Sequence, residues 1–445
     1  MLDREKQVHG IMGVGDHLET LWNRLSSVGS GLLTLVWLLA ALGLPRPLPA
    51  FLWGVEQAEV KLPAGTVLYL RLEAPVSTTA SHLHAAVVAR VVRDVPAGEG
   101  SGPVAVPIGA QVKGSVQKLI PSSSPTDRAR LLLRFDQLEI PGRPAAAIEG
   151  HVLDVENARE TILPDGTIQG VLASELPLTM LEGALDKLKK TSPDMGGEMQ
   201  KQAEKKLGKS DTSINYPAGT DFSVALDKPL VLSQSSSSAV AGQLPPEVGG
   251  AVEHLLSDAP QRAAGKDGKP GDPLNLVFIG NAEQIHQTFE QAGWAEAEKL
   301  TGKSFFETVR AVMANKGYGS APVSQLDLYG RAEDLAFQKM LNTFAKRHHL
   351  RVWRSPTTAA DGREIWLGAA THDTGWDIRP GVVSHAIDPE LDKEREKVGA
   401  DLAVTGRVSA ERLVTRPSPL SEGLTATGAS WKTDGRLLVI DLKTQ

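Results

Sequence analysis

The chain has no cysteine, few aromatic residues and no excess of positive charge. The absence of cysteine among 445 residues excludes disulfides, thiolate zinc sites, iron–sulfur clusters and cysteine nucleophiles. Lysine and arginine number 47 against 53 aspartates and glutamates, and the net charge of -6 argues against a nucleic-acid partner held by general electrostatics. The length suffices for two or three domains with their own cores. Stability therefore demands no cofactor, and the identity of any cofactor stays unknown.

One long apolar segment lies near the amino terminus. No charged residue occurs between Arg24 and Arg46, and the most apolar part, from Gly31 to Leu44, has the length of a signal-peptide core. The full uncharged stretch also reaches the roughly 20 residues of a membrane-spanning helix. We therefore predict that residues 1–58 are a signal peptide or membrane anchor. This places the protein in the periplasm or cell envelope, with the inner membrane contacted through this segment; a buried helix of a soluble domain is the alternative.

Residues 60–172 show the pattern of a β-rich domain. Short stretches alternate between apolar and polar residues, which is typical of half-buried antiparallel strands. A Pro-x-Gly turn at Pro63 begins one such strand, and the same turn recurs at Pro107 and Pro217, where glycine permits the reversal. The pattern predicts an antiparallel β-barrel or sandwich.

Two segments of linker composition follow this domain. Residues 173–232 predict a helical linker and a returning β-strand. Residues 233–271 are rich in serine, glycine and proline, which indicates a flexible linker around one short helix at 248–257. The last domain boundary is therefore expected near residue 272.

Residues 272–445 predict an α/β domain with a mixed sheet, so that the whole chain belongs to the multidomain α+β class. Strands are expected at 274–280, 348–353, 364–373 and 381–387, and helices from Asn281, at 304–315, at 332–340 and after Asp388. Asp388 is the expected N-cap of the last helix, because proline follows it. The acidic residues of that helix predict a solvated face: Glu390, Asp392, Glu394 and Glu396. Asp392 is expected to form an ion pair with Arg395, one turn away.

The first domain resembles the TrbI-like envelope β-domains over residues 60–155. The resemblance is carried by Pro63-Ala64-Gly65, Pro107-Ile108-Gly109 and the strand from Arg130 to Leu138. It implies an envelope β-domain.

The last domain is similar to the LssY C-terminal-domain family, which occurs in bacterial envelope proteins. The similarity is carried by Leu274 to Gly280, Ala292-Gly293-Trp294, Ala321 to Ser324, Tyr329-Gly330-Arg331, Asp334 to Lys339, Arg347 to Trp353, Trp366 to Ala370, His385 to Asp392 and Glu394-Arg395. It implies a cell-envelope role and no particular reaction. The phosphatase-like region of fused family members is missing, so the resemblance implies no phosphatase activity.

Two adjacent histidines stand in the predicted strand at 347–353. Side chains of a strand alternate between its faces, so His348 is expected in the core, hydrogen-bonded to a neighbour. His349 shares the opposite face with Arg351 and Trp353. An arginine and an imidazole on one face can hold an oxyanion beside a flat apolar wall. These three residues are therefore candidate ligand-binding residues.

Four further residues are expected to meet that trio in one crevice. His372 and Asp373 end the neighbouring strand, and His385 and Asp388 lie where another strand passes into a helix. Metal binding would combine His349, His372 or His385 with Asp373 or Asp388, but no recognised metal-ligand spacing is present, and no metal site is predicted.

The sequence thus favours an exported envelope protein that binds an anionic or polar envelope ligand. A metal-assisted or acid-base hydrolase is one alternative, and a structural component of a secretion or envelope complex is another. Whether the protein is an enzyme stays open.

Overall fold

The computed structural model describes residues 59–98, 103–124, 126–175, 212–233, 242–265, 268–297, 325–343, 345–379, 382–425 and 428–444. Residues 58–445 form one compact unit. The predicted signal or anchor at 1–58, the helical linker after residue 175 and the helix at 304–315 lie outside the described residues. Among the helices that are described, none combines the length and apolarity needed to span a membrane.

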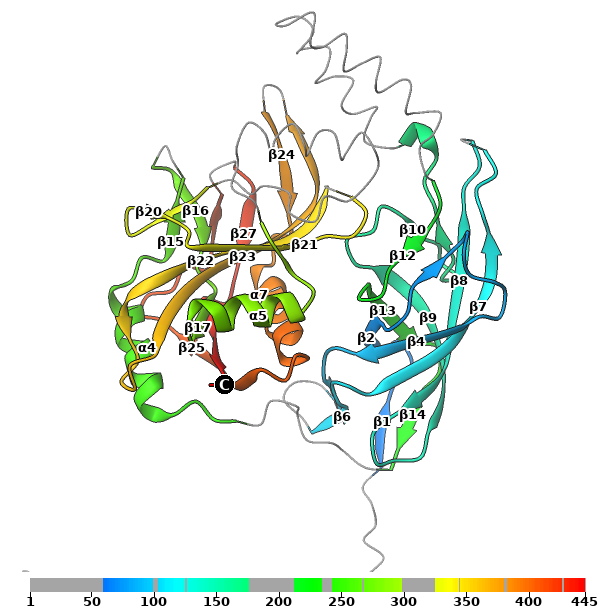
Figure 1. The fold of residues 1–445 in the computed structure, drawn as a ribbon, viewed down its shortest axis with the longest axis horizontal. Coiled ribbons are helices and arrows are strands. Elements are labelled where there is room, and N and C mark those ends of the chain that lie inside the picture. Colours follow the sequence, from blue (N-terminus) through cyan, green and yellow to red (C-terminus); the bar gives the residue numbers. More distant parts are fainter. Residues whose placement is uncertain are drawn as a thin grey trace, which may run out of the picture. The chain divides into compact units, whose positions relative to one another are not determined.

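Six antiparallel strands of the first region close into a barrel (Figure 1). Their order around the barrel is β8, β7, β4, β2, β13 and β9, and β9 pairs back to β8. The strands are β2 (Val67–Leu72), β4 (Ala86–Val91), β7 (Gln111–Ile120), β8 (Arg130–Glu139), β9 (Ala146–Val155) and β13 (Asp221–Leu226). This closure decides between the two predicted architectures in favour of the barrel.

Short elements flank the barrel strands. They are β1 (Val60–Leu62), β3 (Val76–Ser77), β5 (Val95–Pro96), β6 (Val104–Val106), β10 (Thr161–Ile162), β11 (Ile168–Gln169), the 3-10 helix η1 (Ala173–Glu175), β12 (Asn215–Tyr216) and β14 (Leu230–Leu232). The three predicted Pro-x-Gly turns lead into β2, β7 and β13, and their glycines Gly65, Gly109 and Gly219 all have positive φ angles, of 83°, 88° and 89°. The returning strand predicted before residue 232 is β13, which lies between β2 and β9.

The second region is built on a mixed sheet, as predicted. Its order is β18, β21, β22, β23, β17, β28 and β25, and β24 pairs with β23 off this path. Only β17 and β28 pair in parallel among these described strands. The strands are β17 (Leu276–Ile279), β18 (Ala295–Glu296), β21 (Leu335–Lys339), β22 (Lys346–Thr358), β23 (Glu364–Arg379), β24 (Val382–Ile387), β25 (Val408–Thr415) and β28 (Arg436–Leu442).

Helices cover both faces of this sheet (Figure 1). Helix α4 (Pro246–Asp258) packs on one face, in a core that contains Val277 and Trp353. Helices α5 (Ala282–Gln291) and α7 (Leu391–Ala403) pack on the other, in a core that contains Phe278. The remaining strands lie outside the main sheet: β15 (Arg262–Ala264), β16 (Pro270–Pro273), β19 (Asp327–Leu328), β20 (Arg331–Ala332), β26 (Glu422–Leu424) and β27 (Ser430–Lys432).

Three sequence-based predictions for this region are wrong. The helix predicted at 248–257 is present as α4, but the segment 233–271 is not a flexible linker throughout, because α4 and β15 contribute buried side chains to the core of the second region. The helix predicted at 332–340 is the strand β21, whose pairing with β22 outweighs its local helical preference. The N-cap of α7 is Glu390, and the Asp388 carboxylate instead accepts a hydrogen bond from the Glu390 amide at 2.9 Å.

The start of α5 agrees with the prediction. Asn281 is its N-cap and forms a reciprocal capping box with Gln284, at 2.8 and 2.7 Å. Gly293 follows its end with a φ of 84°.

Candidate functional site

The paired strands β22 and β23 carry polar side chains on both faces. Leu350 and Val352 pack in the core beside α5 and α7, whereas Trp353 packs in the core beside α4. This is the predicted alternation, and it places His348 and His349 on opposite faces of the sheet.

On the face of His349, the polar groups form a closed network of ion pairs. Asp373 lies 3.1 Å from the His349 Nε2 atom and accepts a hydrogen bond from the Arg347 guanidinium at 3.0 Å. Arg351 donates to Asp272 at 3.0 Å. Burial alone would raise the pKa of Asp373, but His349 and Arg347 hold that pKa well below its usual range. The charges here are already compensated inside the protein, which leaves little attraction for an external anion.

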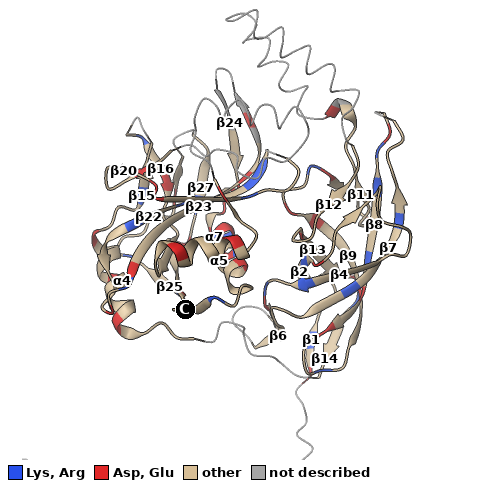
Figure 2. Cartoon of the chain, viewed as in Figure 1, with Lys and Arg blue, Asp and Glu red and all other residues tan. Residues whose placement is uncertain are grey.

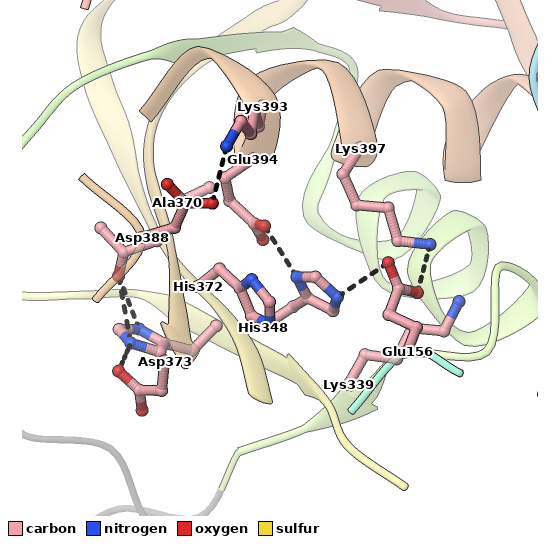
Figure 3. Close-up of polar contacts among 12 residues, drawn as sticks. Glu156, Lys339, His348, Ala370, His372, Asp373, Asp388, Lys393, Glu394 and Lys397 are labelled. Atoms are coloured by element: carbon pink, nitrogen blue, oxygen red, sulfur yellow. Dashed lines mark hydrogen bonds and ion pairs between the residues drawn. The ribbon is translucent and has the colours of Figure 1, made fainter. Parts of the chain in front are cut away.

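On the other face, His348 lies between two carboxylates (Figure 3). Its Nδ1 atom is 2.7 Å from Glu394 on α7, and its Nε2 atom is 3.3 Å from Glu156, just after β9. The prediction of a hydrogen-bonded core histidine is therefore confirmed, since only 2% of His348 is exposed. Burial by itself would lower the pKa of His348, but the two carboxylates raise it to about 10. His348 thus holds a proton, and its positive charge, at neutral pH.

His372 stacks on His348 from the neighbouring strand. The two rings are directly opposite in the strand register, with centroids 4.2 Å apart and planes inclined by 20°. Burial and the charge on His348 lower the pKa of His372 to about 4, so the stacked pair contains one charged and one neutral ring.

A hydrogen bond to Asn157 fixes the tautomer of His372. The Asn157 amide nitrogen donates to the Lys339 carbonyl oxygen at 3.2 Å, so its side-chain oxygen is left as the acceptor. The His372 Nε2 atom lies 3.0 Å from this oxygen and must donate its proton to it. The Nδ1 atom of the neutral ring therefore carries a lone pair.

A second group of charges adjoins the histidine pair. Lys397 on α7 contacts Glu156 at 2.9 Å, Asp221 on β13 at 2.9 Å and Asp401 at 2.8 Å. The three carboxylates raise the pKa of Lys397 well above its usual value, although burial opposes this. Two further cations, Arg71 and Lys339, each contact Asp221 and Asp401. This network joins barrel strands to α7.

These side chains border a cavity of about 550 Å³. Barrel residues line part of it, including Tyr69, whose ring lies 4.2 Å from the guanidinium of Arg93. The second region contributes Lys346, His348, His372, Thr374, Asp388, Lys393, Glu394, Glu396, Lys397, Ala400 and Asp401. The volume lies within the usual range of small-molecule sites.

The structure does not bring the seven predicted ligand-binding residues into one pocket. His372 and Asp388 line the cavity. His349, Arg351 and Asp373 belong to the closed network on the other face, and Trp353 is fully buried in the core. His385 lies beside that network, 3.9 Å from Asp373. The separation follows from strand alternation, because His372 and Asp373 are consecutive and point to opposite faces.

Sequence reasoning missed most of the residues around this cavity. Glu394 was assigned to a solvated face, yet it is only 3% exposed, whereas the predicted pair of Asp392 and Arg395 is present at 2.8 Å. The spacing of Lys397 and Asp401, one helical turn apart, was an available signal for an ion pair. Glu156 had no such signal, because its partners are far away in the sequence.

Three residues at the cavity wall have the chemistry of metal ligands. One ligand atom each from His348, His372 and Glu394 lies within 4.8 Å of the others. This set differs from the histidines and aspartates considered from the sequence, although it shares His372 with them.

Comparison with known proteins gives a family match to the second region. A search of curated proteins found no match to the chain. Residues 256–437 match the family model described as LssY C-terminus, from the end of α4 to the start of β28. The family resemblance seen in the sequence is therefore confirmed over residues 256–437, which are similar to the LssY C-terminus family.

Proposed function

We propose that this protein binds a polar ligand, neutral or zwitterionic, in the cavity bordered by His348 and Lys397. The observation that carries the proposal is a cavity of about 550 Å³ whose polar lining comes from both regions of the chain. Cavities of this size with convergent polar groups are the usual sites of small ligands.

The charges around the cavity favour a ligand without a large net charge. Seven carboxylates line it, and seven positive groups line it or contact those carboxylates. The carboxylates are Asp154, Glu156, Asp221, Asp388, Glu394, Glu396 and Asp401, and the positive groups are Arg71, Arg93, Lys339, Lys346, Lys393, Lys397 and His348. An anion would compete with carboxylates already paired to these cations. Of the two ligand classes predicted from the sequence, the polar ligand is therefore preferred over the anionic one.

Thermal unfolding of the full chain tests the ligand class. The probes are N-acetylglucosamine as a neutral sugar, glycerophosphocholine as a zwitterion without net charge and inorganic phosphate as an anion, each at millimolar concentration. We expect N-acetylglucosamine or glycerophosphocholine to raise the Tm, because binding to the native state stabilises it, and phosphate to leave the Tm unchanged. The Tyr69→Ala variant should lose the response, whereas Tyr329→Ala, away from the cavity lining, should retain it. A rise in Tm with phosphate alone contradicts the proposal, and so does the absence of a rise with all three probes.

We also propose that the ligand is met in the cell envelope. The support is the uncharged apolar segment between Arg24 and Arg46, together with the LssY C-terminal domain. Fractionation of bacteria that express the full chain should recover it in the periplasm or with the inner membrane. Recovery in the cytoplasm alone would contradict this part of the proposal.

A further inference from the structure

We propose that His348, His372 and Glu394 bind a divalent transition-metal ion such as zinc at the wall of the cavity. Two imidazoles and one carboxylate are a donor set that zinc accepts, with a fourth position left for water or a ligand. The inference rests on the proposed function in one respect, namely that all three residues line the proposed binding cavity.

The first observation is geometric. The three ligand atoms come from three elements, β22, β23 and α7, and lie within 4.8 Å of one another. Metal–ligand bonds of about 2.0–2.2 Å would bring them to about 3.4 Å apart. Binding therefore requires a small contraction, and the His372 ring must rotate out of the stack so that both imidazole planes contain the ion.

The second observation is an unused ligand atom. The Oε1 atom of Glu394 is buried and has no hydrogen-bond partner among the described residues, although the Oε2 atom contacts His348. A buried carboxylate oxygen normally has a partner, because removing it from water without one costs free energy. A metal ion would supply that partner.

The third observation concerns the surroundings of the histidines. Asn157 accepts the proton of His372 Nε2, which leaves Nδ1 without a proton, and the Asn157 amide can follow the rotating ring and provide the outer hydrogen bond that usually supports a metal-bound histidine. Glu156 and Glu394 place negative charge on both sides of His348 (Figure 3). These two carboxylates would also attract a dication to this position.

Metal titration of the full chain tests the inference without any organic ligand. Protein stripped with a chelator and dialysed is titrated with zinc by calorimetry and with cobalt(II) by visible absorption. We expect one equivalent of metal to bind, and we expect the visible absorption of bound cobalt(II) to be that of an ion with a low coordination number. The variants His372→Asn and Glu394→Gln should each weaken metal binding by about 100-fold or more. Loss of a residue that only hydrogen-bonds to a metal ligand typically costs about 10–100-fold, and loss of a ligand itself should cost at least as much.

The matched control is His385→Asn, since His385 lies outside the cluster and should leave metal affinity unchanged. Circular dichroism verifies that each variant folds, and if Glu394→Gln fails to fold, His372→Asn decides the question. Equal affinity in the wild type and His372→Asn would overturn the inference and identify the cluster as an internal ion pair. The Tm tests of the organic probes, repeated with chelator present, fail or succeed independently of the metal titration.

Discussion

The two faces of the β22–β23 pair show opposite uses of buried polar side chains. On the His349 face, Asp373 is shared by His349 and Arg347, and the network is closed by protein partners. On the His348 face, the carboxylates of Glu156 and Glu394 lie beside a cavity, and one oxygen of Glu394 has no partner among the described residues. The comparison suggests that the first face stabilises the domain and that the second is available to a ligand.

Charged residues are spread over both regions, and α7 carries several acidic positions (Figure 2). What distinguishes the two faces is therefore the cavity beside the His348 face and the unpartnered oxygen of Glu394, and not the number of charges. The following predictions test this distinction, from the largest expected effect to the smallest.

The largest effect is expected on the closed face. Asp373→Asn leaves the buried Arg347 without the carboxylate that balances it, and we expect a loss of about 3–5 kcal/mol in the free energy of unfolding. Denaturant unfolding at pH 7 measures it, with Asp258→Asn on the exposed end of α4 as the control. Metal affinity of the folded fraction should not change. A loss below about 1 kcal/mol would show that the closed network is not stabilising.

The pH dependence of this variant has a defined sign. The folded-state pKa of Asp373 is depressed, so its contribution is present above the ordinary aspartate value of 3.8 and is lost as the pH falls through the folded-state value. The wild-type protein should therefore lose more stability between pH 5 and pH 2.5 than Asp373→Asn does. Parallel curves for the two proteins would contradict the assignment.

A somewhat smaller effect is expected beside the cavity. Lys397→Met removes the cation shared by Glu156, Asp221 and Asp401, but Arg71, Lys339 and His348 still contact these carboxylates. We expect a loss of about 2–3 kcal/mol in the free energy of unfolding. Lys393→Met is the matched control, because its side chain is exposed and should cost well below 1 kcal/mol. Equal losses in the two variants would remove the distinction between buried and exposed pairing on α7.

Glu411 provides a carboxylate that has no compensating cation among the residues that the structure describes. Burial, together with the nearby Asp94, raises the pKa of this β25 residue from 4.5 to about 7. The folded protein then binds more protons than the unfolded chain between these two values, so stability falls as the pH rises through this window. Glu411→Gln should therefore gain about 1–2 kcal/mol relative to the wild type on going from pH 4.5 to pH 8.

Denaturant unfolding across that range measures the gain, with the exposed Glu422→Gln as the control. The sign is the reverse of that expected for Asp373, because Asp373 has cations beside it. A gain for Glu411→Gln that is independent of pH would refute the interpretation.

The smallest effect is expected at an exposed ion pair on the same two strands. Arg354 contacts Glu364 at 3.1 Å, and more than half of the arginine side chain is exposed. Arg354→Ala should change the free energy of unfolding by about 0.5 kcal/mol, since solvent and salt screen such pairs. An effect as large as that of Asp373→Asn would show that burial does not separate these networks.

Several elements could be predicted from the sequence because their signals are local. The Pro-x-Gly turns before β2, β7 and β13 depend on neighbouring residues, and so does the capping box of Asn281 and Gln284. A helix was predicted at 332–340 where the structure has the strand β21 (Leu335–Lys339), because its partner β22 decides its conformation. The cap of α7 was misplaced from Glu390 to Asp388, since a local motif allowed more than one start.

The candidate site was predicted less well than the fold. Of the seven residues named from the sequence, His372 and Asp388 line the cavity. Glu394 and Lys397 were missed because an acidic helix resembles a solvated one until its packing is known.

The sequence by itself determined the alternation that separates His348 from His349, the turns that begin the barrel strands and the LssY C-terminal domain, because these depend on local spacing and on order along the chain. Only the tertiary structure decided that His348 lies between Glu156 and Glu394 and that Lys397 joins α7 to barrel residues. Those contacts join residues up to 241 positions apart, from Glu156 to Lys397, and pairing over such a distance is set by the packing of whole elements and not by any local pattern.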